Sequence, residues 1–147
     1  MGELTLPDSS LVYVDTQILI YSVEKHPTYW PLLRPLWLKS ATGEIQIISS
    51  ELTLLETLVA PLRNADSVLI TAYETLLLST EMQLMPITRA ILREAAQFRA
   101  QTNLRTPDAI HAATAIAHDC SIFLTNDNGF RRVSSLPIVV LSDIAAT

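Results

Sequence analysis

The chain has 147 residues, a usual length for one folded domain, and 49% of them are hydrophobic, which is enough to bury a substantial core without disulfide bonds. The charged and aromatic fractions, 17% and 6%, are ordinary for a globular protein and exclude a fibrous or largely disordered chain. The formal net charge of −5 argues against nucleic-acid binding through a surplus of basic side chains, an objection that weakens if the acids hold divalent cations against the phosphates.

The number of cysteines and the length of the apolar segments indicate the cellular compartment of the protein. Cys120 is the only cysteine, so the chain forms no internal disulfide and fits a reducing compartment such as the cytoplasm. The first ten residues lack the basic start and apolar run of an export signal, and no later segment approaches the ~20 apolar residues of a spanning helix. We therefore expect a cytoplasmic protein without a membrane span.

The first half of the chain alternates short apolar runs with helical patterns. Residues 11–14 are apolar and rich in β-branched side chains, which predicts a strand that ends at the polar Asp15. Ser49 or Ser50 is placed to cap a later helix, and Asp66 is placed to cap the one after it, for which the apolar spacing favours a buried helix. The remaining elements expected here are helices at 18–23 and 29–40, a strand at 45–48, and helices at 52–59 and 66–77.

The second half continues the alternation. Thr88 is placed to cap an amphipathic helix, and Thr106, Pro107 and Asp108 form a strong helix start, with a proline in the first turn and an acid that the helix dipole favours. The strands expected around these two helices are 82–87, 121–125 and 137–141, with a turn at 126–129.

Strands that alternate with helices indicate an α/β fold with a mostly parallel sheet of about five strands and helices on both faces. No internal repeat or domain boundary interrupts the pattern, so residues 1–147 are expected to form a single domain. Ligands of such folds bind beyond the carboxyl ends of the strands. Asp15 and Asp127 each follow a predicted strand and are therefore expected at that edge.

Four acids that are distant in sequence can meet in this fold: Asp15, Glu56, Asp108 and Asp127. Each one alone is better explained as a solvated surface residue. Together, however, clustered carboxylates repel one another unless they bind cations or take up protons, and their hard oxygen atoms suit Mg²⁺ or Mn²⁺. The apolar residues around Asp15 and Glu56 place these two acids near buried surface, where a charged group needs a partner.

The surroundings of these acids resemble the PIN domains, a family that includes the VapC toxin nucleases. Residues 14–20 (VDTQILI) look like the family's first acidic motif, and the segment from Ser50 to Glu56 looks like its serine and glutamate motif. The most specific piece is 106–115 (TPDAIHAATA), which resembles the third motif, and 124–130 (LTNDNGF) resembles the fourth. Gln17 is a departure, since Asn or Ser is commoner in the family at that position.

The resemblance implies a PIN-like endoribonuclease that hydrolyses RNA phosphodiester bonds with Mg²⁺ or Mn²⁺. Carried over residue by residue, it implies Asp15, Glu56 and Asp108 as metal ligands, with Asp127 completing the site directly or through water. It also implies a toxin with an antitoxin protein as partner, and a homodimer. The accessory candidates are Thr125, as a hydroxyl contact, and Arg105. Like Arg131 and Arg132, Arg105 flanks the acidic motifs, which fits a contact to RNA phosphate, an ion pair with an acidic partner tail or a solvated side chain.

Other residues with suitable chemistry are better explained by structure. His111 lies one turn after Asp108, but a histidine in an alanine-rich helix is more often packed and hydrogen-bonded. Cys120 has no nearby basic cluster that would activate a thiol. Glu51 falls on a different helix face from Glu56.

Four other functions are alternatives to a toxin nuclease, and the sequence argues against two of them. A phosphate-accepting receiver domain also places an Asp after a strand, but this chain has no Lys after Lys39. A nucleotide-binding enzyme would need a glycine-rich loop, and only three Gly residues are present. A non-catalytic interaction module on the same fold and a free-standing RNA-processing nuclease both remain open alternatives to a toxin.

Overall fold

A parallel sheet forms the centre of the protein in the computed structural model, which describes residues 2–79 and 81–147. Within these residues the sheet has five strands in the order β3-β2-β1-β4-β5, and each neighbouring pair is parallel. The expected α/β fold is thereby confirmed. In chain order the strands are β1 Leu11–Val14, β2 Gln46–Ser50, β3 Gln83–Met85, β4 Ile122–Thr125 and β5 Ile138–Val140.

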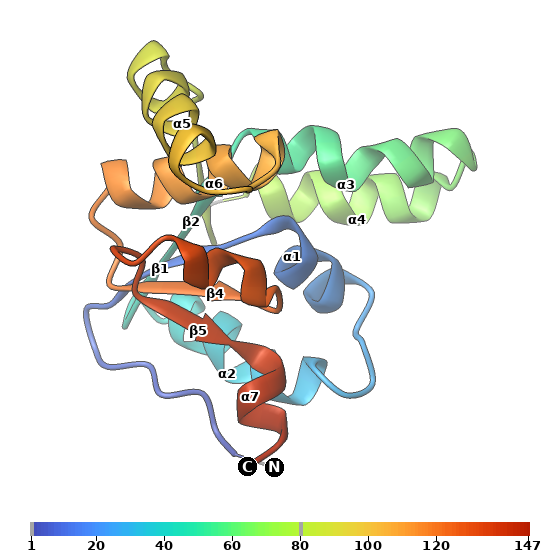
Figure 1. The fold of residues 1–147 in the computed structure, drawn as a ribbon. Coiled ribbons are helices and arrows are strands. Elements are labelled where there is room, and N and C mark those ends of the chain that lie inside the picture. Colours follow the sequence, from blue (N-terminus) through green and yellow to red (C-terminus); the bar gives the residue numbers. More distant parts are fainter. Residues whose placement is uncertain (1, 80) are drawn as a thin grey trace.

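Helices make the crossover connections that parallel strands require, and they cover both faces of the sheet (Figure 1). Both termini lie close together at the same end of the molecule, where the Gly2 backbone N–H donates to the Ile144 carbonyl at 3.1 Å (Figure 1). In chain order the helices are α1 Thr16–Val23, α2 Trp30–Ala41, α3 Leu52–Arg63, α4 Ser67–Leu77, α5 Arg89–Gln101, α6 Thr106–Ala117, the 3-10 helix η1 Asn128–Arg132 and α7 Leu141–Ala145.

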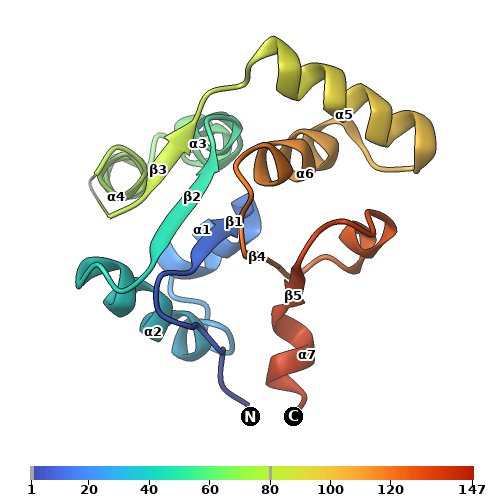
Figure 2. The same cartoon turned by 90° about the vertical axis from the view of Figure 1, so that its left-hand side faces the viewer.

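Each face of the sheet has its own hydrophobic core, because successive residues of a strand point to opposite sides. On β1, Val12 and Val14 pack into the core that α1, α2 and α4 cover, whereas Tyr13 packs into the core beneath α5 and α6. Phe123 of β4 lies in this second core and stacks on Tyr13 with ring centroids 5.1 Å apart. Figure 2 shows the two layers, with α2 on one side of the strands and α6 on the other.

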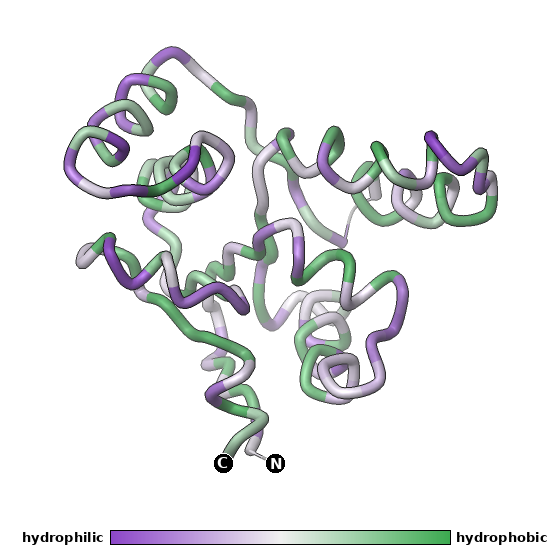
Figure 3. Tube along the Cα trace, turned by 45° about the vertical axis from the view of Figure 1, so that its right-hand side comes forward, coloured by the Kyte–Doolittle hydropathy of each residue, from purple (hydrophilic) through white to green (hydrophobic). Residues whose placement is uncertain are grey.

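Helices α3 and α4 run side by side and project beyond the sheet (Figure 1). On α4, Tyr73 and Leu77 are buried, but Val68 is 80% exposed. Figure 3 shows hydrophobic stretches along this projecting pair. The expectation of a buried helix at 66–77 is therefore wrong for its first half, because apolar spacing identifies a face without showing what covers it. Exposed apolar residues on α3 are Leu55, Val59 and Leu62.

Local hydrogen bonds explain why some helices and strands begin or end at other residues than the sequence predicted. Helix α1 begins at Thr16, two residues earlier than expected, because the Asp15 carboxylate accepts from the Ile18 backbone N–H at 3.2 Å. Strand β2 continues to Ser50, and Ser49 does not cap a helix, since its hydroxyl donates to the Val14 carbonyl at 2.6 Å.

The other differences concern elements near the sheet edges and the C-terminus. Strand β3 is shorter than the expected 82–87, the expected turn at 126–129 leads into η1, and the chain ends in α7, which the apolar pattern of 137–141 did not predict. Pro61 lies inside α3, which nevertheless continues to Arg63. Asp66 caps α4 as expected, accepting from the Leu69 N–H. In the part of the chain that the structure describes, no helix combines the length and apolarity needed to cross a membrane.

Candidate active site

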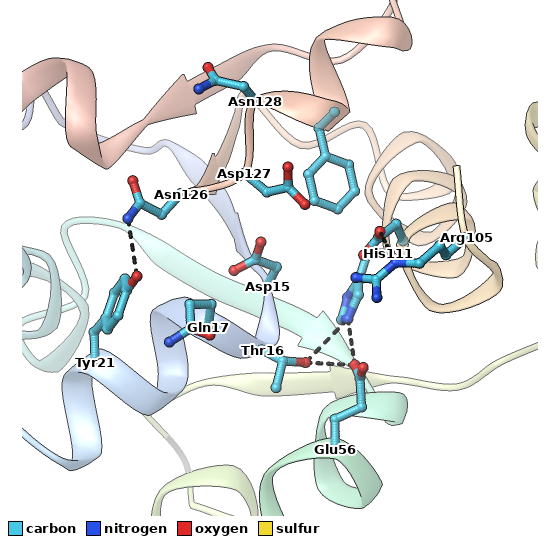
Figure 4. A pocket seen from close by; sticks show the side chains of 12 residues that line it. Asp15, Thr16, Gln17, Tyr21, Glu56, Arg105, His111, Asn126, Asp127 and Asn128 are labelled. Carbon is cyan, nitrogen blue, oxygen red and sulfur yellow. Dashed lines mark hydrogen bonds and ion pairs between the residues drawn. The ribbon is translucent and has the colours of Figure 1, made fainter. Parts of the chain in front are cut away.

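The four acids that the sequence singled out line one pocket beyond the carboxyl ends of the central strands. Asp15 follows β1 and Asp127 follows β4, while Glu56 comes from α3 and Asp108 from the first turn of α6. The pocket has a volume of about 650 Å³, and Figure 4 shows Asp15, Glu56 and Asp127 around the same space. Its other lining residues are Thr16, Gln17, Tyr21, Arg105, His111, Asn126, Asn128 and Phe130.

Asp15 is the most deeply placed of the four acids, with only 6% of its surface exposed. One carboxylate oxygen accepts from the Ile18 N–H that begins α1, and the other accepts from the Thr125 hydroxyl at 2.5 Å. Burial raises the pKa of Asp15, as does the charge of Asp108, while the hydrogen bond from Thr125 and the nearby His111 lower it in part. The net effect is a carboxyl group that holds its proton more strongly than usual.

Thr125 joins the ends of the two central strands. Its hydroxyl donates to Asp15 and accepts from the Asp127 backbone N–H at 3.0 Å. Parallel pairing brings Thr125 and Asp15 together, because β1 and β4 end at the same edge of the sheet. Thr125 therefore orients two of the predicted site residues, and its accessory role in a reaction stays a prediction.

Glu56 is held by two neighbours. The Thr16 hydroxyl donates to its Oε1 at 2.7 Å, and His111 Nε2 lies 2.9 Å from the same oxygen. Burial raises the pKa of Glu56, but these two hydrogen bonds, with the charge of Arg105, outweigh burial and leave the pKa below its ordinary value. Glu56 thus ionises more readily than an ordinary glutamate, whereas the pKa values of Asp15 and Asp108 are raised.

Asp108 lies in the first turn of α6, as the proline and acid pattern predicted. The predicted cap is wrong, because Thr106 is the first residue of the helix, Arg105 holds the cap position without a side-chain cap bond, and the Thr106 hydroxyl accepts from Arg99 at 3.0 Å instead. Arg105 Nε is 3.4 Å from its carboxylate, but the arginine side chain is 80% exposed, so the pair contributes little to stability. Burial raises the pKa of Asp108, the Arg105 charge lowers it, and Asp127 raises it again. Arg105 thus remains at the rim of the pocket, with its guanidinium in solvent.

Asp127 is exposed and caps the short helix η1, where its carboxylate accepts from the Gly129 N–H at 2.8 Å. The loop on this side is held by Asn126, which donates to the Tyr21 hydroxyl at 3.0 Å and accepts from the Ser142 N–H at 2.8 Å. Asp127 is therefore the exposed member of the four acids, whereas Asp15 is the buried one.

A sequence model of the PIN domain matches residues 12–136 of this chain, a stretch that contains all four acids. The chain belongs to the PIN domain family. A comparison with curated proteins gave no match.

Solved structures share this PIN fold at low sequence identity. VapBC2 from Rickettsia felis, bound to a promoter DNA fragment, has a TM-score of 0.70 and 18% identity over 88% of this chain and 98% of that chain. VapC20 from Mycobacterium tuberculosis, a toxin that cleaves the sarcin-ricin loop, has a TM-score of 0.70 and 17% identity over 86% and 97%. PAE2754 from Pyrobaculum aerophilum has a TM-score of 0.59 and 15% identity over 94% and 96%. At such identities the likeness shows the fold alone.

The donor set of this PIN pocket fits a hard divalent cation. All four acids offer carboxylate oxygens, and the raised pKa values of Asp15 and Asp108 are partly due to acids beside them, a repulsion that a cation would relieve. Across residues 2–79 and 81–147, however, no three His, Cys, Asp or Glu side chains are spaced to clasp one ion together. Mg²⁺ commonly keeps several waters among its ligands, so these carboxylates can hold one ion partly through water.

Sequence reasoning underestimated His111. The prediction of a packed, hydrogen-bonded histidine is confirmed, since the residue is 2% exposed and contacts both Tyr13 and Glu56. The same contacts also connect it to a predicted site residue. The sequence did contain an indication of this contact: His111 lies one turn after Asp108, so both side chains fall on the helix face that lines the pocket. Thr16, directly after Asp15, was also missed, and adjacency was its signal.

The raised pKa values predict how the metal-free protein responds to pH. The unfolded chain ionises Asp15 and Asp108 near their ordinary pKa of 3.8, whereas the folded chain keeps these protons to higher pH. Over that interval the folded state binds more protons, so these two groups make the free energy of unfolding fall as pH rises. Glu56, with its lowered pKa, acts in the opposite direction and only below its ordinary value of 4.5.

Urea unfolding in EDTA from about pH 4 to about pH 7 checks this expectation. The double variant Asp15→Asn with Asp108→Asn should gain stability relative to the wild type as pH rises. The matched control is Asp119→Asn, because Asp119 is exposed and does not line the pocket. A constant difference between double variant and wild type across this range would show that neither acid is perturbed in this way.

Proposed function

We propose that this PIN chain is a metal-dependent endoribonuclease that hydrolyses RNA phosphodiester bonds, and that residues 1–147 act as a single nuclease domain. The observation that carries the proposal is the convergence of Asp15, Glu56, Asp108 and Asp127 on one pocket at the carboxyl edge of the sheet. Family membership supports it independently, because the matched region includes each of these acids.

In this proposal Asp15, Glu56 and Asp108 bind Mg²⁺ or Mn²⁺, and Asp127 completes the site directly or through water. When bound, the ion would supply an activated water and offset charge on the phosphate. The chain's own residues prepare the pocket for it: Thr125 orients the Asp15 carboxylate, and Thr16 orients that of Glu56. No covalent nucleophile is needed, and Cys120, outside the pocket with a pKa raised by burial to about 11, is unsuited to be one.

RNA binding has to overcome the acidic balance of the chain. Arg105 lines the pocket and contacts Asp108 through Nε, but its side chain is 80% exposed, so the other N–H groups of the guanidinium can reach a phosphate oxygen next to the metal site. Arg131 does not line this pocket, and it pairs with Asp143. We therefore assign Arg105 as the phosphate contact in this proposal.

The experiment that tests the proposal is RNA cleavage with controlled metal. Purified protein should cut a single-stranded RNA in the presence of Mg²⁺ or Mn²⁺, stop when EDTA removes the ion, and resume when excess Mn²⁺ is restored. DNA of the same sequence serves as the substrate control. Cleavage that continues at an equal rate in EDTA would contradict the proposed metal dependence.

A role as the toxin of a toxin-antitoxin pair follows from the same proposal. Structures of similar fold include the VapBC complexes from Rickettsia felis and Salmonella typhimurium, both bound to DNA. By analogy we propose an antitoxin protein as partner, a homodimer as the assembly and the cytoplasm as the location. Free-standing RNA processing is the alternative use of the same activity. Growth arrest on expression, relieved by co-expression of the neighbouring gene, distinguishes the toxin from a processing nuclease.

A non-catalytic interaction module is a second candidate, which the spacing of the acids favours, since no described trio is already set to clasp an ion. Thermal unfolding with Mn²⁺ discriminates the two. A bound ion that relieves repulsion between the acids should raise the melting temperature, and the rise should grow with ion concentration. An unchanged melting temperature together with absent RNA cleavage would favour the module.

A further inference from the structure

A series of hydrogen bonds connects the core of the protein to Glu56. The Tyr13 hydroxyl lies 2.6 Å from His111 Nδ1, and His111 Nε2 lies 2.9 Å from Glu56 Oε1. The three residues come from β1, α6 and α3, and both aromatic members are buried. Figure 4 shows the last hydrogen bond of this series, with His111 and Thr16 both directed at Glu56.

The direction of the last hydrogen bond follows from the chemistry of its partners. An ionised carboxylate only accepts, so Nε2 must carry hydrogen to bond with Oε1. This holds for the neutral ring and for the imidazolium alike. In the neutral ring the other nitrogen, Nδ1, accepts, and Tyr13 is suited to donate to it because burial raises the pKa of the Tyr13 hydroxyl well above its usual value.

Both donors bind the same oxygen of Glu56. His111 and Thr16 converge on Oε1, whereas no residue within 2–79 or 81–147 forms a hydrogen bond with Oε2. The Glu56 side chain is 26% exposed and lines the pocket. Left alone, such a side chain would sample several rotamers, and ordering it on ligand binding would cost conformational entropy.

We propose that His111, supported by Tyr13, is a positioning residue that holds Glu56 through Oε1 and leaves Oε2 for the divalent cation. The inference rests on the proposed metal-dependent function and adds an outer layer of two residues to its site. Hydrogen-bond partners of metal ligands commonly affect metal affinity by about 10- to 100-fold. His111 thus acts on the ion through Glu56 and needs no contact with RNA.

Mn²⁺ affinity, measured by calorimetric titration of the full chain without RNA, tests the proposal. His111→Leu removes the donor and should weaken Mn²⁺ binding about 10- to 100-fold. His111→Gln should stay within about threefold of the wild type, because the glutamine amide nitrogen lies as many bonds from the backbone as Nε2 and still donates. Tyr13→Phe keeps the ring packing and should have a smaller effect than His111→Leu.

A double-mutant cycle separates positioning from general structural support. In the background Glu56→Gln, where no carboxylate remains to be held, His111→Leu should cause no further loss of Mn²⁺ affinity. An equal loss in both backgrounds would overturn the proposal, because His111 would then act through the fold. If His111→Leu does not fold, the same cycle is run with Tyr13→Phe and is read in the same way.

The outcomes also separate this inference from the proposed function. A wild type that binds Mn²⁺ as tightly as His111→Leu does would overturn the positioning role alone. A wild type that binds no Mn²⁺ would overturn the metal-dependent function and this inference with it. Weak binding by His111→Leu with recovery in His111→Gln supports both.

Discussion

Asp15→Asn is expected to reduce metal-dependent RNA cleavage by about 10²- to 10³-fold, the scale that follows the loss of one preorganised electrostatic contact in an active site. The substitution removes the most buried charge of the pocket but keeps the local structure, because asparagine caps helices as well as aspartate does. Its amide can still accept from the Ile18 N–H and can donate to the Thr125 oxygen. Single-turnover cleavage of a labelled RNA measures the loss.

The folded state of this variant is expected to be at least as stable as the wild type in EDTA. Burial and the Asp108 charge both disfavour ionised Asp15. A neutral side chain avoids this free-energy cost in the metal-free protein. Asp119→Asn is the matched control, with the same chemical change at an exposed position, and should retain full activity. Retained cleavage by Asp15→Asn would refute its assignment as a ligand, and a loss of folding would show that Asp15 is chiefly structural.

Phe123→Ala is expected to cause the largest loss of stability, about 3 to 5 kcal/mol, which is the usual cost of truncating a buried aromatic ring. Phe123 is fully buried on β4 between two other rings, stacked on Tyr13 and 4.7 Å in centroid distance from Phe130. Phe130 lines the pocket and Tyr13 contacts His111, so the cavity would open directly beneath the site. Urea unfolding measures the change in the free energy of unfolding, and thermal unfolding should show a melting temperature lower by about 10 to 16 °C.

Leu62→Ala is a suitable comparison, because it also removes a large apolar side chain but from an exposed position on α3. It should change the free energy of unfolding by less than about 0.5 kcal/mol. A Phe123→Ala variant as stable as Leu62→Ala would mean that the core of this face collapses around the missing ring.

Local sequence patterns were sufficient to predict the central strands and the acids that follow them. The run 11–14 is wholly apolar and ends in an acid, which is how a buried parallel strand meets the open edge of its sheet. Pro107 and Asp108 likewise mark the first turn of α6, although Thr106 is its first residue and not its cap. Parallel topology then brings Asp15 and Asp127 to one edge without any further information.

The remaining features depend on contacts between distant segments, which a periodic pattern does not contain. The spacing of Val68 and Leu69 marks an apolar face, but only the projection of α3 and α4 from the sheet decides that Val68 stays in solvent. The contact of His111 with Glu56 spans 55 residues and requires α3 and α6 to meet. Neither helix alone carries a signal for it.

The hydroxyl of Thr125 meets the carboxylate of Asp15 across 110 residues of chain. A polypeptide emerging from the ribosome therefore cannot assemble this pocket until β4 has been synthesised and has paired beside β1. A nascent polypeptide that stops before β4 therefore lacks the proposed nuclease site. Long-range strand pairing thus ties assembly of the pocket to the synthesis of β4.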